Sequence, residues 1–211
     1  MAAGLSRSGR WILGALATVF AAELAFALAA PTEVAGYRVI LHWTGVSLHA
    51  VLEGRLWTVA SYMLVHSLDG WGHLFANALG VWFATGELER RYGCAQVLRL
   101  AVAAGLAGGL AVVLTQAVAA AFGAPASLPT IGASGAVLGL VAGFCRVFWC
   151  QRLLVWGVLP TTGRGVFVVL VALQAVLVAV APAVSVAAHA GGMAVGYVAV
   201  GPRPRMDTVW L

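Results

Sequence analysis

Charged side chains are scarce in this chain of 211 residues: they make up 9% of the sequence, and lysine is absent. A soluble globular domain averages about 25% charged residues. So few charges could not cover a soluble surface, which excludes a soluble globular enzyme and a disordered chain. The twelve basic residues are all arginines, dispersed between apolar runs, so they form no basic patch for a nucleic acid. With 62% hydrophobic residues, the composition predicts an integral membrane protein.

Cysteine is also scarce. Cys94, Cys145 and Cys150 are too few and too irregularly spaced for a disulfide framework or a zinc site. We interpret them as small, buried apolar residues.

The few charges mark where the chain cannot lie inside a bilayer. A membrane span needs about 20 mostly apolar residues. Residues 100–145 form an uncharged run of 46, and residues 165–202 form another of 38. Each run is long enough for two helices joined by a turn. The pattern predicts six spans, at residues 11–30, 70–87, 98–122, 133–151, 165–181 and 185–201.

Six spans put both termini on one side, and the arginines indicate which side. Two arginines, Arg38 and Arg55, fall on the outer side. Ten fall on the inner side: Arg7, Arg10, Arg90, Arg91, Arg99, Arg146, Arg152, Arg164, Arg203 and Arg205. This excess predicts cytoplasmic termini, with tails at 1–10 and 202–211 around a membrane domain at 11–201. A chain rich in alanine, with arginine as its sole basic residue, also favours a GC-rich bacterial genome and hence an inner membrane.

A long outer loop, residues 31–69, joins the first two predicted spans. It is semi-apolar and holds aromatic residues of the kind found at bilayer interfaces. The stretch from 52 to 66 is expected to form an interfacial helix or hairpin. A connection this long between packed helices is more often functional than passive.

Polar side chains are costly inside a bilayer and are candidates for function. His73 and Asn77 lie four residues apart in the first turns of the second span, so they share one helix face. A hydrogen bond between helices is the structural alternative for this pair. His189, in the first turns of the sixth span, needs a partner to be tolerated. Glu23, in the first span, is expected to make a structural hydrogen bond or to carry a protonated carboxyl group.

Ser134 opens the fourth span between small residues, in the sequence Gly-Ala-Ser-Gly at 132–135. A serine at a helix start is ordinarily an N-cap. The functional alternative is a nucleophile, because small neighbours leave it accessible and the free N–H groups nearby favour an anion. The second, fourth and sixth spans all run inward from the outer side. We therefore expect Ser134, His189, His73 and Asn77 at a similar depth in the outer leaflet.

Glycines recur every four residues on the two helices that carry Ser134 and His189. They are Gly135, Gly139 and Gly143 on the fourth span, and Gly192 and Gly196 on the sixth. Glycine is abundant throughout the chain, but small residues at this spacing let helix backbones approach closely. The pattern predicts that these two helices bring the serine and the histidine together.

A serine beside a histidine can perform acyl transfer. The histidine takes the proton of the weakly nucleophilic hydroxyl and later returns a proton to the leaving amine. The developing oxyanion needs donors, which the Asn77 amide, the His73 ring and a backbone N–H near Ser134 can supply. No aspartate or glutamate is placed to orient His189, so the sequence predicts a dyad rather than a triad.

These residues resemble the rhomboid intramembrane serine proteases over about residues 54–201. The motifs, in the family's order, are His73-x-x-x-Asn77, Gly132-x-Ser134-Gly135 and Ala188-His189-x-Gly191-Gly192-x-x-x-Gly196. The segment from Gly86 to Gly93, with Glu89 inside it, is similar to the one that commonly follows the family's second span.

The resemblance implies an all-α bundle of six transmembrane helices with a long membrane-associated first loop. It implies cleavage of peptide bonds in or near transmembrane segments, with Ser134 as nucleophile and His189 as base. His73 and Asn77 would help to hold the oxyanion. Gly132, Gly135, Gly192 and Gly196 would be the motif glycines. The expected partners are transmembrane protein substrates and the lipid bilayer, without nucleic acid, metal or cofactor.

Three positions depart from the family's pattern. In the first loop Trp57 is followed by Thr58, where the family often has arginine. This change is expected to loosen the anchoring of the loop. His66 precedes His73 by seven residues rather than five, which is expected to lengthen the loop. Leu138 replaces an aromatic residue that packs on the catalytic histidine, which is expected to lower the rate.

Three alternatives predict other functions. An inactive rhomboid-like protein that binds membrane clients would typically lack the serine or the histidine. A transporter or channel would need polar residues at several depths, whereas these are expected at one. A metal site built from His42, His49, His66 and His73 would lack any acidic or cysteine ligand.

Overall fold

The computed structural model describes residues 4–68, 71–125, 128–155, 158–180, 185–201 and 209–210. Its helices are α1 (Arg7–Ala29), α2 (Glu33–Thr44), α3 (Leu48–Leu52), α4 (Thr58–Ser61), α5 (Gly72–Tyr92), α6 (Cys94–Ala121), α7 (Ser134–Val147), α8 (Gly163–Val180) and α9 (Val186–Ala199). Its strands are β1 (Arg152–Val155), β2 (Leu159–Thr162) and β3 (Val209–Trp210). Each predicted span therefore overlaps a helix, namely α1 and α5 to α9. Most of the expected tail at 202–211, including Arg203 and Arg205, lies outside the described residues.

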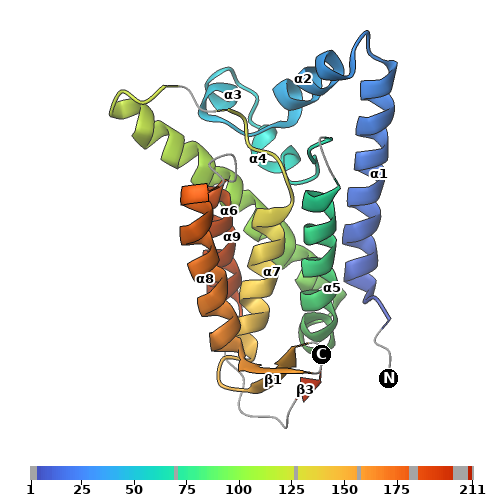
Figure 1. The fold of residues 1–211 in the computed structure, drawn as a ribbon, viewed down its shortest axis with the longest axis vertical. Helices are drawn as coiled ribbons and strands as arrows, with labels where there is room; N and C mark the ends of the chain where they lie inside the picture. The colour runs from blue at the N-terminus through green and yellow to red at the C-terminus, as the bar shows by residue number, and fades with distance from the viewer. Residues whose placement is uncertain are drawn as a thin grey trace.

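Figure 1 shows a helix bundle with α7 and α9 at its centre, α8 on one flank and α5 on the other. Helix α9 packs chiefly on α7 and α6, and α1 packs on α5 at the edge of the bundle. The short helices α2, α3 and α4 cover one end, and the strands lie at the opposite end, together with the start of α1 (Figure 1).

The helices differ in whether they are long enough to cross a bilayer. Among the described residues, α1 and α6 are long and apolar enough to cross a bilayer by themselves, whereas α7 and α9 are shorter apolar helices of 14 residues each. At 1.5 Å per residue, 14 residues span roughly 21 Å, less than the hydrocarbon core of about 30 Å. The expected spans of 133–151 and 185–201 are thus longer than the helices observed there.

The all-α expectation needs one correction. Between the predicted spans 133–151 and 165–181 the chain forms strands, because β1 pairs antiparallel with β2 and parallel with β3. A short apolar run such as 152–155 does not distinguish strand from helix by its periodicity. In the outer loop, the stretch 52–66 holds the last residue of α3 and the single turn Thr58–Ser61, and the longest helix is α2, which begins earlier.

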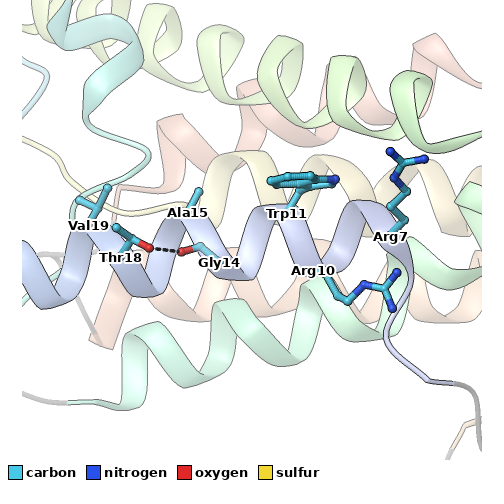
Figure 2. A pocket seen from close by; sticks show the side chains of 7 residues that line it. All are labelled: Arg7, Arg10, Trp11, Gly14, Ala15, Thr18 and Val19. Atoms are coloured by element: carbon cyan, nitrogen blue, oxygen red, sulfur yellow. Dashed lines mark hydrogen bonds between the residues drawn. The ribbon is translucent and has the colours of Figure 1, made fainter.

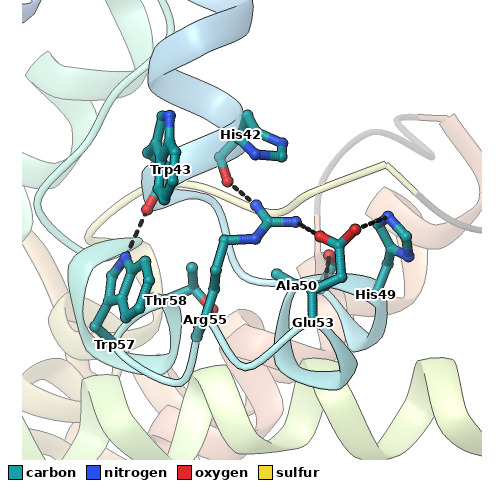
Figure 3. A network of polar contacts seen from close by, with 9 residues as sticks. His42, Trp43, His49, Ala50, Glu53, Arg55, Trp57 and Thr58 are labelled. Carbon is teal, nitrogen blue, oxygen red and sulfur yellow. Dashed lines mark hydrogen bonds and ion pairs between the residues drawn. The ribbon is translucent and has the colours of Figure 1, made fainter.

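Buried Arg55 anchors the outer loop from inside (Figure 3). Its guanidinium donates to the backbone oxygen of His42 and pairs with Glu53, and the Thr58 hydroxyl donates to the Arg55 backbone oxygen at 2.7 Å. The Trp57 ring N–H also donates to the Trp43 backbone oxygen at 2.8 Å. Arg55, two residues before Trp57, thus holds the loop together. Thr58, expected to loosen the loop, makes a hydrogen bond to Arg55.

Buried Tyr62 connects the outer loop to the two helices beneath it. Its hydroxyl donates to the backbone oxygen of Gly105 on α6 at 2.7 Å, and its own backbone oxygen accepts from the N–H of Gly132 at 2.8 Å. Val46 and Thr130 exchange backbone hydrogen bonds of 2.8 and 2.9 Å nearby. These contacts fix the segment from which α7 begins.

Helix α1 exposes one face along an open groove (Figure 2). Arg7, Arg10 and Trp11 line the first turns, and small or apolar residues line the remainder up to Val19. Arginine and tryptophan side chains at a helix end suit a bilayer interface, where a polar head meets water and an apolar stem meets lipid.

The carboxylate of Glu89 joins the end of α5 to the start of α1. It accepts from the backbone N–H of Ser8 at 2.6 Å and from that of Arg7 at 3.2 Å. Glu89 follows the predicted span, in the last turn of α5. Burial alone would raise the pKa of Glu89, but the hydrogen bonds from Ser8 and Arg7 lower it overall.

A Glu89→Gln variant tests this junction. A lowered pKa in the folded state means that Glu89 stabilises the fold above its ordinary pKa of about 4.3, and that this contribution is lost as the pH falls through the lowered value. We expect the variant to be less stable than the parent at pH 7 and the difference to shrink on acidification. Thermal unfolding in detergent between about pH 7 and pH 3 measures this difference in stability. A difference in thermal midpoint that stays constant with pH would contradict the role of the Glu89 carboxylate.

Candidate active site

A cavity of about 1090 Å³ lies between α5, α7, α8 and α9. Its walls are largely apolar, from residues such as Phe83 on α5, Val141 on α7 and Leu170 on α8. Five polar side chains on these four helices line it: His73, Asn77, Ser134, Gln174 and His189. The structure therefore brings all four predicted polar residues to one cavity, with a fifth that the sequence analysis did not select.

Ser134 is the first residue of α7, and its hydroxyl does not cap the helix. The N-cap is Ala133, which makes no side-chain cap hydrogen bond. The Ser134 Oγ instead lies 2.7 Å from Nε2 of His189, a residue 55 positions later in the chain. The N-cap interpretation of this serine does not hold.

His189 lies in the first turn of α9 and is 6% exposed. Ser185 begins the helix, since its hydroxyl accepts from the N–H of Ala188 at 3.4 Å. Each ring nitrogen of His189 has a partner: Nε2 contacts Ser134, and Nδ1 lies 2.6 Å from Oε1 of Gln174 on α8.

Gln174 is the functional candidate that the sequence analysis missed. It is buried, and its amide nitrogen also donates to the backbone oxygen of Leu170 at 3.4 Å. The third member of such a site is ordinarily a carboxylate, and none lines this cavity among the described residues. A signal was nevertheless present, because Gln174 is the one side chain with a hydrogen-bonding group in the run 165–180.

The fourfold glycine spacing corresponds to direct backbone contact between α7 and α9. A Cβ on Gly192 would overlap the carbonyl oxygen of Gly135, and one on Gly196 would overlap that of Gly139. Any side chain at these positions would push the two helices apart. The glycines therefore set the separation at which Ser134 and His189 form a hydrogen bond.

Gly132 meets His73 from the other side of the cavity. Its φ of +118° is a conformation that residues with a side chain rarely adopt, and a Cβ there would lie 2.9 Å from Nε2 of His73. Glycine thus satisfies both the backbone conformation before α7 and the close approach of the His73 ring.

Asn77 is 3% exposed and has a partner that the sequence analysis did not predict. Its amide nitrogen lies 3.1 Å from Nε2 of His66, and the rings of His66 and His73 lie 5.3 Å apart. Despite the longer spacing in sequence, His66 thus reaches the group of polar residues in this part of the bundle.

Glu23 supports this group from α1, since its Oε2 accepts from the backbone N–H of His66 at 3.2 Å. This is the structural hydrogen bond expected for it. In the described part of the chain, its other oxygen, Oε1, is buried without a hydrogen-bond partner.

The described residues contain no cluster of three or more histidine, cysteine or acidic side chains that could hold a metal ion. The three cysteines are free: Cys145 is buried, Cys94 is partly buried and Cys150 is exposed. The interpretation of Cys150 as a buried residue is therefore wrong.

Comparison with known proteins identifies the family. The model of the rhomboid domain matches residues 53–202, which is more than half of the chain, and the chain belongs to the rhomboid family. This confirms the family predicted from the three motifs and supports a location in a membrane.

One relative carries a protease name. The chain is 26% identical over 121 residues to the rhomboid protease GluP of Bacillus subtilis (strain 168), a match that covers 57% of this chain and 21% of that protein. The matched region thus spans about a fifth of the relative's length. Protease activity in this chain, and the roles of its site residues, are proposals.

Proposed function

We propose that this protein is an intramembrane serine endopeptidase that cleaves peptide bonds in or near transmembrane segments of membrane proteins. The observation that supports it most is the 2.7 Å contact between Ser134 Oγ and His189 Nε2 inside an apolar cavity. Membership of the rhomboid family supports the same reaction.

In the proposed mechanism Ser134 attacks the carbonyl carbon of the scissile bond while His189 Nε2 takes the hydroxyl proton. The imidazolium then donates that proton to the departing amine, and an acyl-enzyme ester remains on Ser134. A water molecule, deprotonated by the same nitrogen, attacks the ester, and the proton returns to Ser134 as the carboxylic acid product leaves. The residues suffice for both steps without a cofactor.

The oxyanion would lie at the N-terminal end of α7. The first N–H groups of a helix lack partners within it, and the helix dipole favours negative charge there. Asn77 adds an amide with two N–H groups, of which the contact with His66 occupies one. His73, which lines the same cavity, adds a ring N–H. We assign these groups to the oxyanion hole.

The substrate would enter between α5 and α8, which form the apolar walls of the cavity. On the outer face of α8, Val168 and Val178 are exposed and do not line the cavity, as expected for a helix that meets lipid. We further propose six spans with cytoplasmic termini in a bacterial inner membrane, which the arginine distribution supports.

The experiment is cleavage of a single-span substrate in liposomes, with the products identified by mass spectrometry. A cut within or beside the apolar segment is expected, together with labelling of Ser134 by a fluorophosphonate probe. Binding of several such substrates without cleavage or labelling would favour the alternative, an inactive rhomboid-like module that binds membrane proteins.

A His189→Ala variant tests the general base. We expect its rate of cleavage to fall by at least about 10²-fold, the usual contribution of acid–base catalysis, while substrate binding changes little. A His42→Ala variant is the control, because the His42 side chain lies in the outer loop and does not line the cavity. Unchanged turnover in His189→Ala would mean that the base is misassigned.

A further inference from the structure

Gln174 is placed to determine which nitrogen of His189 carries the proton. Its amide nitrogen donates to the backbone oxygen of Leu170, one turn earlier on α8. This bond turns the amide oxygen toward His189, where Oε1 lies 2.6 Å from Nδ1. A carbonyl oxygen only accepts hydrogen bonds, so the proton of the neutral imidazole must lie on Nδ1.

A proton on Nδ1 leaves Nε2 with a free lone pair, directed at the Ser134 hydroxyl at 2.7 Å. This is the tautomer that a general base needs. In the other tautomer Nε2 would carry the proton and could not accept the one from the serine. Gln174 thus faces His189 in the manner of the carboxylate in a catalytic triad, but without a negative charge.

The residue one turn after the nucleophile gives His189 no comparable support. Leu138 lines the same cavity, but its aliphatic side chain has no ring to stack on the imidazole and no group to hydrogen bond with it. Among the hydrogen bonds of the described residues, the His189 ring makes two, one with Ser134 and one with Gln174.

We propose that Gln174 is a positioning residue that holds His189 in its Nδ1-protonated tautomer and in line with Ser134, so that the site works as a Ser–His–Gln triad. The proposal rests on the proposed protease function. It also means that α8, which forms one wall of the cavity, orients the base.

A spectroscopic experiment tests the tautomer without any need for turnover. The protein is labelled with ¹⁵N-histidine in detergent, and the His189 signals are assigned by their loss in His189→Ala. We expect protonated Nδ1 and unprotonated Nε2 in the parent, and a mixture of tautomers in Gln174→Leu. A proton on Nε2 in the parent, or the same tautomer in both proteins, would overturn the proposal whether or not the protein is a protease.

Kinetics provide the second test. Gln174→Leu should lower kcat about tenfold, the rate equivalent of one neutral hydrogen bond, with little change in KM. Gln116→Leu is the matched control, because it removes another amide whose oxygen accepts from the N–H of Leu48 at 2.7 Å, away from the cavity. Equal kcat values in the parent and Gln174→Leu would overturn the positioning role.

Gln174→Glu separates positioning from a structural role. A carboxylate beside Nδ1 stabilises the imidazolium, so the acidic limb of the kcat profile should move to higher pH while kcat at its plateau is restored. Of the residues that line the cavity, His73 is the other histidine, and it is unchanged in every variant. A profile identical to that of the parent would contradict the proposal.

Discussion

Ser134→Ala is expected to abolish measurable cleavage of a transmembrane substrate. Loss of the nucleophile from a serine protease site lowers kcat by about 10⁶-fold, because the remaining groups cannot form the acyl-enzyme. The hydroxyl makes no helix cap, so its removal should leave the start of α7 intact. The variant should therefore fold and bind substrate as the parent does.

The matched control is Ser61→Ala. The Ser61 hydroxyl donates to the backbone oxygen of Thr44 at 3.0 Å in the outer loop, and it does not line the cavity. Both variants lose one hydroxyl and one hydrogen bond, but only Ser134→Ala should lose activity. Initial rates in liposomes at matched protein density, with thermal unfolding as a check on folding, give the comparison. Equal rates in the parent and Ser134→Ala would refute the proposed function.

The charge pattern predicts the position of the long helices well. Every predicted span overlaps an observed helix, because charged residues are excluded from the hydrocarbon and their gaps mark the possible spans. The ends are less predictable where no charge marks them. Helix α7 ends at Val147, four residues before the predicted boundary, and a strand follows at Arg152.

Motif spacing predicts which residues meet better than it predicts what supports them. The glycine repeats indicate the contact between α7 and α9 because the absence of a side chain has one obvious consequence, a close approach of backbones. Gln174 and His66 are harder to find. An amide on α8 and an imidazole in the outer loop have many possible partners, and only the packed structure selects among them.

Gly192→Ala is the second substitution with a large expected effect. Its Cβ would overlap the carbonyl oxygen of Gly135, a backbone atom that cannot move independently of α7. Overpacking of this kind costs about 1–3 kcal/mol. Because Gly192 follows His189 by three residues on α9, the displacement would also separate the histidine from Ser134. A misplacement of about 1 Å can cost 10²-fold in rate.

Gly14→Ala provides the control for the loss of a glycine from a membrane helix. Gly14 lies in the interior of α1, and a Cβ there would have no atom within 4 Å. Since alanine restricts the unfolded chain more than glycine does, this variant should be as stable as the parent or up to about 1 kcal/mol more stable. Gly192→Ala should instead show a lower thermal midpoint and, at temperatures where it remains folded, at least about 10²-fold slower cleavage. Parent-like stability with parent-like turnover would mean that α7 and α9 tolerate a wider separation, and that their glycines do not set the geometry of the site.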